Sequence, residues 1–293
     1  MPVSHLLLAV LVTVLWGWNF VAIKAGLDSL PPLLFTALRF VIAALPALWM
    51  PRPAGSWRWL LIAGGGIGVV QFGCLFTAMD GHISPGLASL VLQMQAFFTV
   101  LLARIVDGTK PRPWQWWGLA LAFAGIALIG TDLDASVSAG GLALILVAAL
   151  GWASGNLAMR RAGAVNMLHF VVWMSLVPPL PLALASLCLE GPGALSRAWT
   201  AIDPIGAAAL GYIVVASTWI GYGVWGWLMQ RHAVTLVAPF SLLVPLNGML
   251  AAMLVYGEHY GPLRLVACAL VLAGLTLNTF GGRLRWWRPA LAS

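Results

Sequence analysis

The sequence predicts an all-α, polytopic membrane protein whose ten transmembrane helices form two inverted five-helix repeats. Three observations carry this prediction: the composition, the spacing of the apolar runs and an internal repeat. Of the 293 residues, 61% are hydrophobic and only 8% are charged, whereas an ordinary soluble domain carries about 25% charged residues. A water-facing surface cannot be built from this composition. It therefore excludes a soluble enzyme and makes a lipid bilayer the expected surroundings.

Apolar runs follow one another along the whole chain, and proline, glycine or charged residues separate them. A helix that crosses a bilayer needs about 20 mostly apolar residues, and each run comes close to this length. The first run lacks a basic leader and a small-residue cleavage site, so we predict a retained helix and not a signal peptide. The predicted spans are residues 5–27, 33–50, 58–79, 85–105, 113–130, 140–160, 166–188, 204–228, 234–256 and 262–282.

The positive charges favour one side of the predicted membrane. An even number of spans places both termini on the same side, and most Lys and Arg residues fall in the loops of that side. The positive-inside rule therefore predicts cytoplasmic termini, and it explains the net charge of +7 without a nucleic-acid partner. The side of the termini holds Arg52, Arg58, Arg104, Lys110, Arg112, Arg160, Arg161, Arg231, Arg283, Arg285 and Arg288; the other side holds Lys24, Arg39, Arg197 and Arg264.

Two stretches of the first half recur in the same order in the second half. Residues 19–26 parallel residues 156–163, and residues 85–129 align without a gap on residues 234–278. We therefore divide the chain into a first repeat, residues 1–133, and a second repeat, residues 139–285. Since five spans is an odd number, the two repeats are expected to insert in opposite orientations. Such inverted repeats, with a site at their interface, are typical of secondary transporters; the alternative is a likeness of composition alone.

Several motifs of this chain are also found together in one known family. They are residues 16–26 (WGWNFVAIKAG), Pro31-Pro32 and residues 38–40 (LRF), followed by residues 86–98 (GLASLVLQMQAFF) and 238–245 (APFSLLVP). The first group resembles the EamA family of the drug/metabolite transporter superfamily. The last two motifs are similar to its cysteine and O-acetylserine exporter branch. The resemblance implies a bacterial inner-membrane exporter of amino acids or related metabolites.

One departure from that family concerns the acid that follows the fourth and ninth helices. Gly257-Glu258 keeps the Gly-Glu pair of the family, but Gly108 is followed by Thr109. The sequence shows no catalytic or metal-ligand pattern, because the histidines are scattered and the cysteines show no CxxC spacing. We therefore expect neither an enzyme nor a cofactor or metal site.

Uncharged polar side chains at membrane depth are the candidate substrate contacts. An amide in hydrocarbon is costly unless it is hydrogen-bonded, so each is expected to face a cavity or to form a structural bond between helices. Gln93 and Gln95 lie about 200° apart on an α-helix, so we do not expect both to face one cavity squarely. The candidate substrate-binding residues are Asn19, Gln71, Gln93, Gln95 and Asn156, with Trp16 and Trp152 as apolar wall and Arg39 as a charged contact.

Lys24 and Arg39 are charged residues within the first two runs. Either could receive the carboxylate of an outgoing amino acid, or could extend its charge to the membrane interface. The place of Lys24 at a helix C-terminus favours the second interpretation, whereas both remain open for Arg39. No Asp or Glu lies near the centre of a span, so we expect gradient-driven efflux, or weak coupling through Glu258 or a histidine.

These observations together predict a membrane protein that exports small amino acids or related metabolites by alternating access between its two repeats. Its partners are then a small-molecule substrate and the lipid bilayer. Two alternatives remain at this stage. One is a broad-specificity drug or metabolite exporter, and the other is a receptor or scaffold in the membrane that transports nothing.

Overall fold

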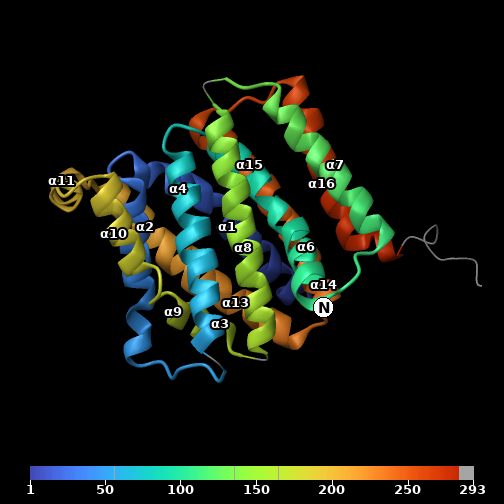
Figure 1. Ribbon diagram of the computed structural model, residues 1–293, viewed down its shortest axis with the longest axis horizontal. Coiled ribbons are helices and arrows are strands. Elements are labelled where there is room, and N and C mark those ends of the chain that lie inside the picture. The colour runs from blue at the N-terminus through green and yellow to red at the C-terminus, as the bar shows by residue number, and fades with distance from the viewer. Residues whose placement is uncertain (56, 135, 164, 284–293) are drawn as a thin grey trace, which may run out of the picture.

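The computed structural model is a bundle of tilted helices (Figure 1). It describes residues 1–283 except residues 56, 135 and 164. The described residues form no β-strand, only the two isolated bridges Ile83–Val137 and Asp134–Val137, which confirms the predicted all-α class. The basic and aromatic residues Arg285, Trp286, Trp287 and Arg288 lie outside the described residues, as do the side chains of Arg197 and Arg283.

The helices of the first half of the chain follow the predicted spans closely. They are α1 (Val3–Leu27); α2 (Pro32–Ala44) with the 3₁₀ helix η1 (Leu45–Leu48); α3 (Trp57–Ala63), the π-helix η2 (Gly64–Gln71) and α4 (Phe72–Met79); α5 (Pro85–Val91), the 3₁₀ helix η3 (Leu92–Met94) and α6 (Gln95–Asp107); and α7 (Pro113–Gly130).

The second half of the described chain has one helix that the sequence did not predict, the short α11 between two predicted spans. Its helices are α8 (Ala139–Ala162); α9 (Met167–Met174) and α10 (Pro179–Leu189); α11 (Ala194–Ala201); α12 (Pro204–Gly211), the π-helix η4 (Tyr212–Ile220) and α13 (Gly221–Arg231); α14 (Val234–Val237), the 3₁₀ helix η5 (Ala238–Leu242) and α15 (Leu243–Tyr256); and α16 (Pro262–Phe280) with η6 (Gly281–Arg283).

Eight helical segments of the described chain are long and apolar enough to cross a membrane. The two other predicted spans, residues 33–50 and 113–130, correspond to the shorter apolar segment Pro32–Leu48 and to α7. The eight segments are Val3–Leu27, Trp57–Met79, Pro85–Asp107, Ala139–Ala162, Met167–Leu189, Pro204–Arg231, Ala238–Tyr256 and Pro262–Phe280.

Proline and glycine mark where these helices begin, break and end. Proline stands in the first turn of α2, α5, α7, α10, α12 and α16, where its missing N–H group costs no hydrogen bond. Prolines inside an apolar run are expected to kink or end a helix; near Pro178 the chain breaks between α9 and α10, and near Pro46 α2 gives way to the 3₁₀ turn η1. Gly108 and Gly257 end α6 and α15 in the left-handed region, with φ of 67° and 63°, which glycine adopts without strain.

The two halves of the chain share the same departures from α-helical geometry. Trp57–Met79 and Pro204–Arg231 each contain a π-helix in the middle, η2 and η4. Pro85–Asp107 and the segment from α14 to α15 each contain a 3₁₀ helix, η3 and η5, and each ends at a left-handed glycine. The 3₁₀ helices η3 and η5 lie within the sequence alignment of residues 85–129 with 234–278, whereas the π-helices η2 and η4 lie outside it. Since π-helices are rare, their occurrence in both halves is a further likeness, one of backbone geometry.

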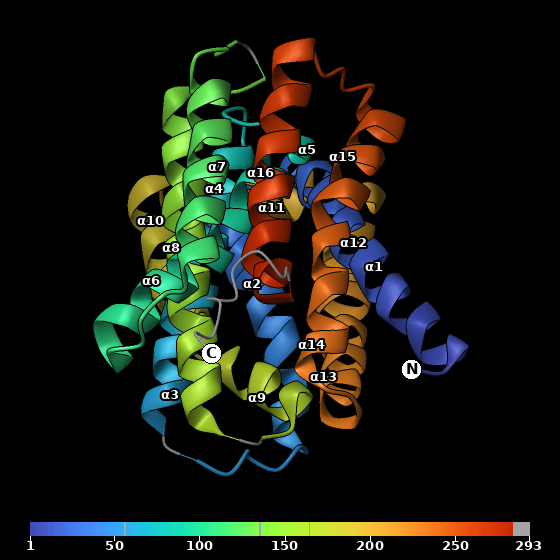
Figure 2. The same cartoon turned by 90° about the vertical axis from the view of Figure 1, so that its right-hand side faces the viewer.

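Small residues bring the helices into close contact at two places. The three consecutive glycines at residues 64–66 of an apolar run predict close helix packing. A Cβ on Gly66 of η2 would lie 2.7 Å from the carbonyl oxygen of Gly151 on α8, which confirms this prediction. A Cβ on Gly118 of α7 would lie 2.7 Å from the carbonyl oxygen of Gly274 on α16. The helices α7 and α16 accordingly lie side by side along one flank of the bundle (Figures 1 and 2). Such glycine contacts are the usual means of close helix association in lipid.

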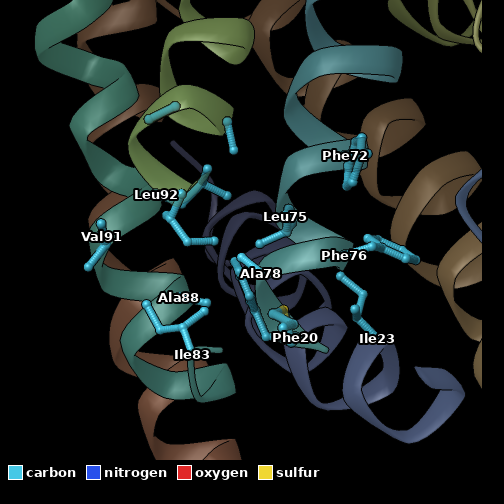
Figure 3. Packing of buried hydrophobic residues seen from close by; sticks show 14 of the residues in the cluster. Phe20, Ile23, Phe72, Leu75, Phe76, Ala78, Ile83, Ala88, Val91 and Leu92 are labelled. Atoms are coloured by element: carbon cyan, nitrogen blue, oxygen red, sulfur yellow. The ribbon is translucent and has the colours of Figure 1, made fainter. Parts of the chain in front are cut away.

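Aromatic and aliphatic side chains fill the space where α1, α4 and α5 meet. Phe20 and Ile23 of α1 pack with Phe72 and Phe76 of α4 in one buried cluster, and Figure 3 shows the side chains of the three helices gathering there. Several members, including Phe20 and Phe72, also line the cavity described below. The core therefore supports one wall of that cavity directly.

Tryptophan and arginine pair at the end of the bundle that carries the loop between α2 and α3. The sequence predicts interfacial tryptophans at the ends of the apolar runs, and an Arg side chain covers several of those rings. Such cation–π contacts suit the boundary between lipid and water. The distances from the guanidinium carbon to the ring centre are 4.5 Å for Arg52–Trp57, 4.1 Å for Arg58–Trp59, 5.6 Å for Arg112–Trp114 and 4.4 Å for Arg231–Trp227.

An ion-pair cluster ties the start of α16 to the loop between α7 and α8, at the opposite end of the bundle. The buried guanidinium of Arg264 donates to Asp132 at 2.9 Å and to Ser136 Oγ at 2.7 Å, and it lies 2.7 Å from Asp134. The hydrogen bond from Arg264, with one from Ser136, lowers the pKa of Asp134 from 3.8 to about 2. Asp134 is itself largely exposed, so solvent screens much of this interaction.

We expect this cluster to stabilise the fold above pH 4 and to weaken below it. Because the pKa of Asp134 is lower in the folded chain, its contribution is complete above the unfolded value and is lost as the pH falls from about 4 toward 2. The melting temperature of the wild type should exceed that of Asp134→Asn at pH 6, and the difference should shrink toward pH 2. An equal difference at both pH values would contradict this assignment.

Candidate functional site

A central cavity lies among helices from both halves of the chain. It encloses about 660 Å³ of empty space, counting the part that is open to solvent. Its wall combines aromatic rings with amide and hydroxyl groups, a mixture that suits a small polar ligand with some apolar surface. The lining residues are Trp16, Asn19, Phe20, Arg39, Gln71, Phe72, Leu75, Ser89, Leu92, Gln93, Gln95, Trp152, Ser217, Tyr222, Ser241 and Val244.

The cavity wall contains seven of the eight residues that the sequence identified as candidate contacts. They come from five segments that are far apart in the chain: α1, α2, η2, the α5–η3–α6 segment and α8. Asn156 is the exception, because it lies behind the wall. The seven residues are Trp16, Asn19, Arg39, Gln71, Gln93, Gln95 and Trp152.

Gln93 and Gln95 both reach the cavity, contrary to the expectation from α-helical geometry. The reason is the 3₁₀ helix η3, which contains Gln93 and immediately precedes Gln95. Side chains two positions apart on an α-helix are about 160° apart by the shorter way round, which is the angle of about 200° given above measured in the other direction. On a 3₁₀ helix, with three residues per turn, they are only about 120° apart. A local change of helix type therefore turns both amides toward the same space.

Asn156 holds the wall in place through its hydrogen bonds. Its Nδ2 donates to Gln95 Oε1 at 2.8 Å and to Thr99 Oγ1 at 3.3 Å, and its Oδ1 accepts from Trp152 Nε1 at 3.1 Å. The amide of Asn156 thus has partners on both of its polar atoms. It fixes two lining side chains, Gln95 and Trp152. The sequence predicted that Asn156 itself would face the cavity, whereas in the structure it supports residues that do.

Trp16 ties α1 to the second repeat at the edge of the cavity. Its Nε1 donates to the carbonyl oxygen of Ser217 in η4 at 3.0 Å. Its ring lies 5.2 Å from each of the rings of Tyr222 and Trp225, measured between ring centres. Trp16 and Asn19 are three residues apart, which places them on one face of an α-helix, and both line the cavity.

Arg39 is a buried charge in the middle of α2, with 2% of its surface exposed. Its Nη2 donates to Thr218 Oγ1 at 3.1 Å, and its guanidinium carbon lies 3.9 Å from the ring centre of Phe72 and 4.7 Å from that of Phe40. Its Nε and Nη1 atoms are buried without a hydrogen-bond partner. The burial excludes extension of this side chain to the membrane interface.

Two of the amides in the wall also lack partners. Asn19 Oδ1 is buried without a hydrogen-bond donor, and neither Oε1 nor Nε2 of Gln71 has a partner. Gln71 is the last residue of the π-helix η2, directly before Phe72. An unmade hydrogen bond in a buried place costs about 1–3 kcal/mol. Each of these atoms is therefore available to a ligand.

Lys24 takes no part in the cavity. It lies in the last turn of α1 and pairs with Asp28 across 3.4 Å, with 31% of its side chain exposed. This position agrees with the expectation, drawn from its place at a helix C-terminus, that Lys24 does not receive the substrate carboxylate.

Carboxylates join the two halves of the chain at both ends of the bundle. Glu258, after α15, accepts from Ser84 Oγ at 2.8 Å, from the backbone N–H of Gly86 at 3.2 Å and from the hydroxyl of Tyr260 at 2.8 Å. At the basic end, Asp107 of α6 pairs with Arg160 and Arg161 of α8.

The retained Gly-Glu acid Glu258 thus caps the start of α5 from the opposite repeat, where a negative charge suits the helix dipole. Burial and the nearby Glu258 carboxylate raise the pKa of Tyr260, which keeps its hydroxyl protonated as a donor.

Sequence reasoning missed the hydroxyl contacts of this site, among them Ser89, Thr218, Tyr222 and Ser241. Ser and Thr are frequent in membrane helices, where they bond to their own backbone, so nothing in their spacing distinguishes these residues. Within the part of the chain that the structure describes, no three His, Cys, Asp or Glu side chains gather as a metal site.

Comparison with known proteins finds relatives along nearly the whole chain. Two stretches, residues 3–131 and 139–280, match the EamA-like transporter family. A protein of Salmonella typhimurium (strain LT2) named a probable amino-acid metabolite efflux pump is 41% identical over 285 residues, which cover 95% of each chain. A protein of Escherichia coli (strain K12) with the same name is 39% identical over 97% of this chain and 96% of its own.

Two further matches are more distant. A probable terminal-alkyne amino-acid exporter of Streptantibioticus cattleyicolor is 29% identical over 94% of each chain. A crystal structure superposes with a TM-score of 0.63 and 22% identity, and the match covers 97% of this chain and 99% of the other. At that identity the likeness shows a common helical fold.

Proposed function

The chain belongs to the EamA-like transporter family, and from this premise we propose that it exports small amino acids or related metabolites of the cysteine and O-acetylserine kind. Family membership makes it a membrane transporter and not an enzyme, as the sequence predicted. Its apolar helices and its bacterial relatives support a multi-pass protein of the inner membrane. The observation that carries the proposal is the central cavity, whose wall offers amide, hydroxyl and guanidinium groups to a small polar solute.

The proposed architecture has ten membrane spans in two inverted repeats, residues 1–133 and 139–285. The shared π and 3₁₀ segments support this division, as do the two separate family matches. The two spans beyond the eight long ones are then Pro32–Leu48 and α7. The first of these spans has the 13 residues of α2 and the 4 of η1, and the second has the 18 residues of α7. At 1.5 Å per residue each span is about 26–27 Å long. A bilayer accommodates such lengths by local thinning.

In this arrangement both termini face the cytoplasm, and the two repeats move against each other around the cavity. The basic end, with its Arg–Trp pairs, is then cytoplasmic and the end with Glu258 is external. Both repeats contribute to the cavity wall, so a relative rotation would expose the cavity to either side in turn. The carboxylate contacts at each end cross between the repeats and are the contacts that opening would break.

Efflux from proteoliposomes tests this function. Vesicles that contain the purified protein and radiolabelled L-cysteine should lose the label in a saturable way, and O-acetylserine should compete. Vesicles without protein are the control, and efflux of the cationic dye ethidium is measured in parallel. Efflux of the dye without efflux of cysteine, O-acetylserine or other amino acids would favour a broad-specificity drug exporter; no protein-dependent flux at all would refute transport.

We further expect efflux to follow the substrate gradient rather than a proton gradient. Among the described residues that line the cavity none is Asp, Glu or His, and proton relays in membranes depend on such groups. Imposing a pH difference across the vesicle should therefore change the initial rate of cysteine efflux by less than about two-fold. Uphill efflux that an imposed pH gradient drives, and that one buried substitution abolishes, would contradict this expectation.

A further inference from the structure

The unsatisfied polar atoms of the molecule are concentrated in the cavity. Among the described residues, the buried side-chain nitrogen and oxygen atoms without a partner belong to Asn19, Arg39 and Gln71, apart from one oxygen of Asn278. The first three residues all line the cavity. Native proteins satisfy nearly all of their buried polar groups, so a local cluster of exceptions calls for an explanation, and a bound ligand is one that fits a cavity. The chemistry of these atoms therefore describes what the cavity holds.

The donors among these atoms surround a positive charge that no carboxylate of the cavity wall compensates. Arg39 alone is charged among the described lining residues, and its neighbours are the hydroxyl of Thr218 and the rings of Phe72 and Phe40. A buried cation without an ionic partner is unfavourable in an apolar surrounding. A solute carboxylate would supply both the missing charge and acceptors for the N–H groups of Arg39, and such charge-assisted bonds are strong.

The acceptors among these atoms lie on different residues. Asn19 Oδ1 and Gln71 Oε1 are oxygens without donors, and Gln71 Nε2 is a donor without an acceptor. An ammonium group has donors only, so it fits the two oxygens, while Gln71 Nε2 can add a hydrogen bond to a carboxylate. The three residues thus offer separate partners to the two charged groups of an amino acid.

We propose that Arg39 is an obligatory anchor for the substrate carboxylate, and that Asn19, with Gln71, receives the substrate ammonium group. This inference rests on the proposed function, because it assigns the specificity of the same cavity. It defines the substrate class: a solute must carry a carboxylate, and cations without one are rejected by the charge of Arg39. The cavity therefore accepts zwitterions and excludes simple amines and cationic drugs.

The two π-helices hold Arg39 in this position. Thr218, which accepts from Nη2, lies in η4 and itself donates to the carbonyl oxygen of Ile213 at 2.8 Å. Phe72, which lies against the guanidinium, directly follows η2. Both repeats thus fix the anchor through their irregular segments, in agreement with the frequent occurrence of π-helices at functional sites. The remaining donors of Arg39 stay available because the protein supplies no further acceptor.

Binding of three matched solutes tests the proposal. L-Cysteine carries both charged groups, cysteamine lacks the carboxylate and 3-mercaptopropionate lacks the ammonium group. Tryptophan fluorescence of the purified protein reports binding, since Trp16 and Trp152 line the cavity. We expect cysteamine to bind at least about ten-fold more weakly than cysteine. Arg39→Gln should remove this preference, and Arg39→Lys, which keeps the charge, should restore part of it.

A control and a stability measurement separate this role from a structural one. Thr36→Val is the control, because Thr36 lies one turn earlier on α2 and its hydroxyl donates to the carbonyl oxygen of Pro32 at 2.7 Å, away from the cavity wall. It should keep the preference for cysteine. Arg39→Met should melt no lower than the wild type, since it removes an uncompensated buried charge.

Equal binding of cysteine and cysteamine by the wild type, or an unchanged preference in Arg39→Gln, would overturn the proposal. A destabilised Arg39→Met that still prefers cysteine over cysteamine would also overturn it, since Arg39 would then be structural. Failure of the proposed function looks different. In that case the wild type moves no amino acid in the efflux assay, whatever the binding preference of its cavity.

Discussion

Gly66→Ala is expected to destabilise the protein, whereas Gly65→Ala, one residue earlier in the same π-helix, is expected to leave its stability unchanged or slightly raised. A Cβ on Gly66 would lie 2.7 Å from the carbonyl oxygen of Gly151, and it would also overlap Ser154 Oγ. Neither α8 nor η2 can give way without moving the backbone. Overpacking of this kind costs about 1–3 kcal/mol, which corresponds to a decrease in melting temperature of several degrees.

Gly65 is a close control for this prediction. A Cβ on Gly65 meets nothing within 4 Å, and alanine stabilises a helix by about 0.5–1 kcal/mol relative to glycine. The two substitutions therefore differ in sign although they add the same methyl group to neighbouring residues. Thermal unfolding of both variants in one detergent measures the difference. If both melt like the wild type, η2 and α8 are not in the close contact described above.

The glycine run shows what the sequence could and could not predict about packing. Three consecutive glycines in an apolar run indicate close approach of helices, and that expectation was correct. The sequence does not indicate which of the three glycines meets α8. A π-helix has more residues per turn than an α-helix, so it changes which residues of the segment face the neighbouring helix. The pattern of hydropathy is the same in an α-helix and a short π-helix, so neither η2 nor η4 could be predicted.

The same limit explains the errors in the candidate site. Composition and periodicity located the polar residues at membrane depth, and most of them do line one cavity. Their directions depend on local helix type, which placed Gln93 and Gln95 on one side through η3. Their roles depend on neighbours from distant segments. Thr99 and Trp152, for example, satisfy Asn156, whereas Asn19, its counterpart in the repeat, keeps an unpaired oxygen.

This contrast between Asn19 and Asn156 leads to the second large effect. The sequence treats the two asparagines alike, and alanine at either position would then be expected to weaken substrate binding and spare the fold. The structure instead predicts opposite outcomes. In Asn156→Ala, Trp152 Nε1 loses its acceptor and Gln95 Oε1 loses its donor. Both hydrogen bonds are partly buried, and a fully buried polar group left without a partner costs about 1–3 kcal/mol, so this variant should melt below the wild type.

Asn19→Ala should behave in the reverse way. Its Oδ1 has no protein partner to lose, and alanine is a good helix former, so the melting temperature should remain close to that of the wild type. Binding of L-cysteine should weaken about ten-fold, because a hydrogen bond to a charged group contributes about 1.5–3 kcal/mol. Binding of 3-mercaptopropionate, which has no ammonium group, should hardly change. If Asn19→Ala binds cysteine normally while Asn156→Ala is stable and binds weakly, the roles of the two amides are the reverse of those described.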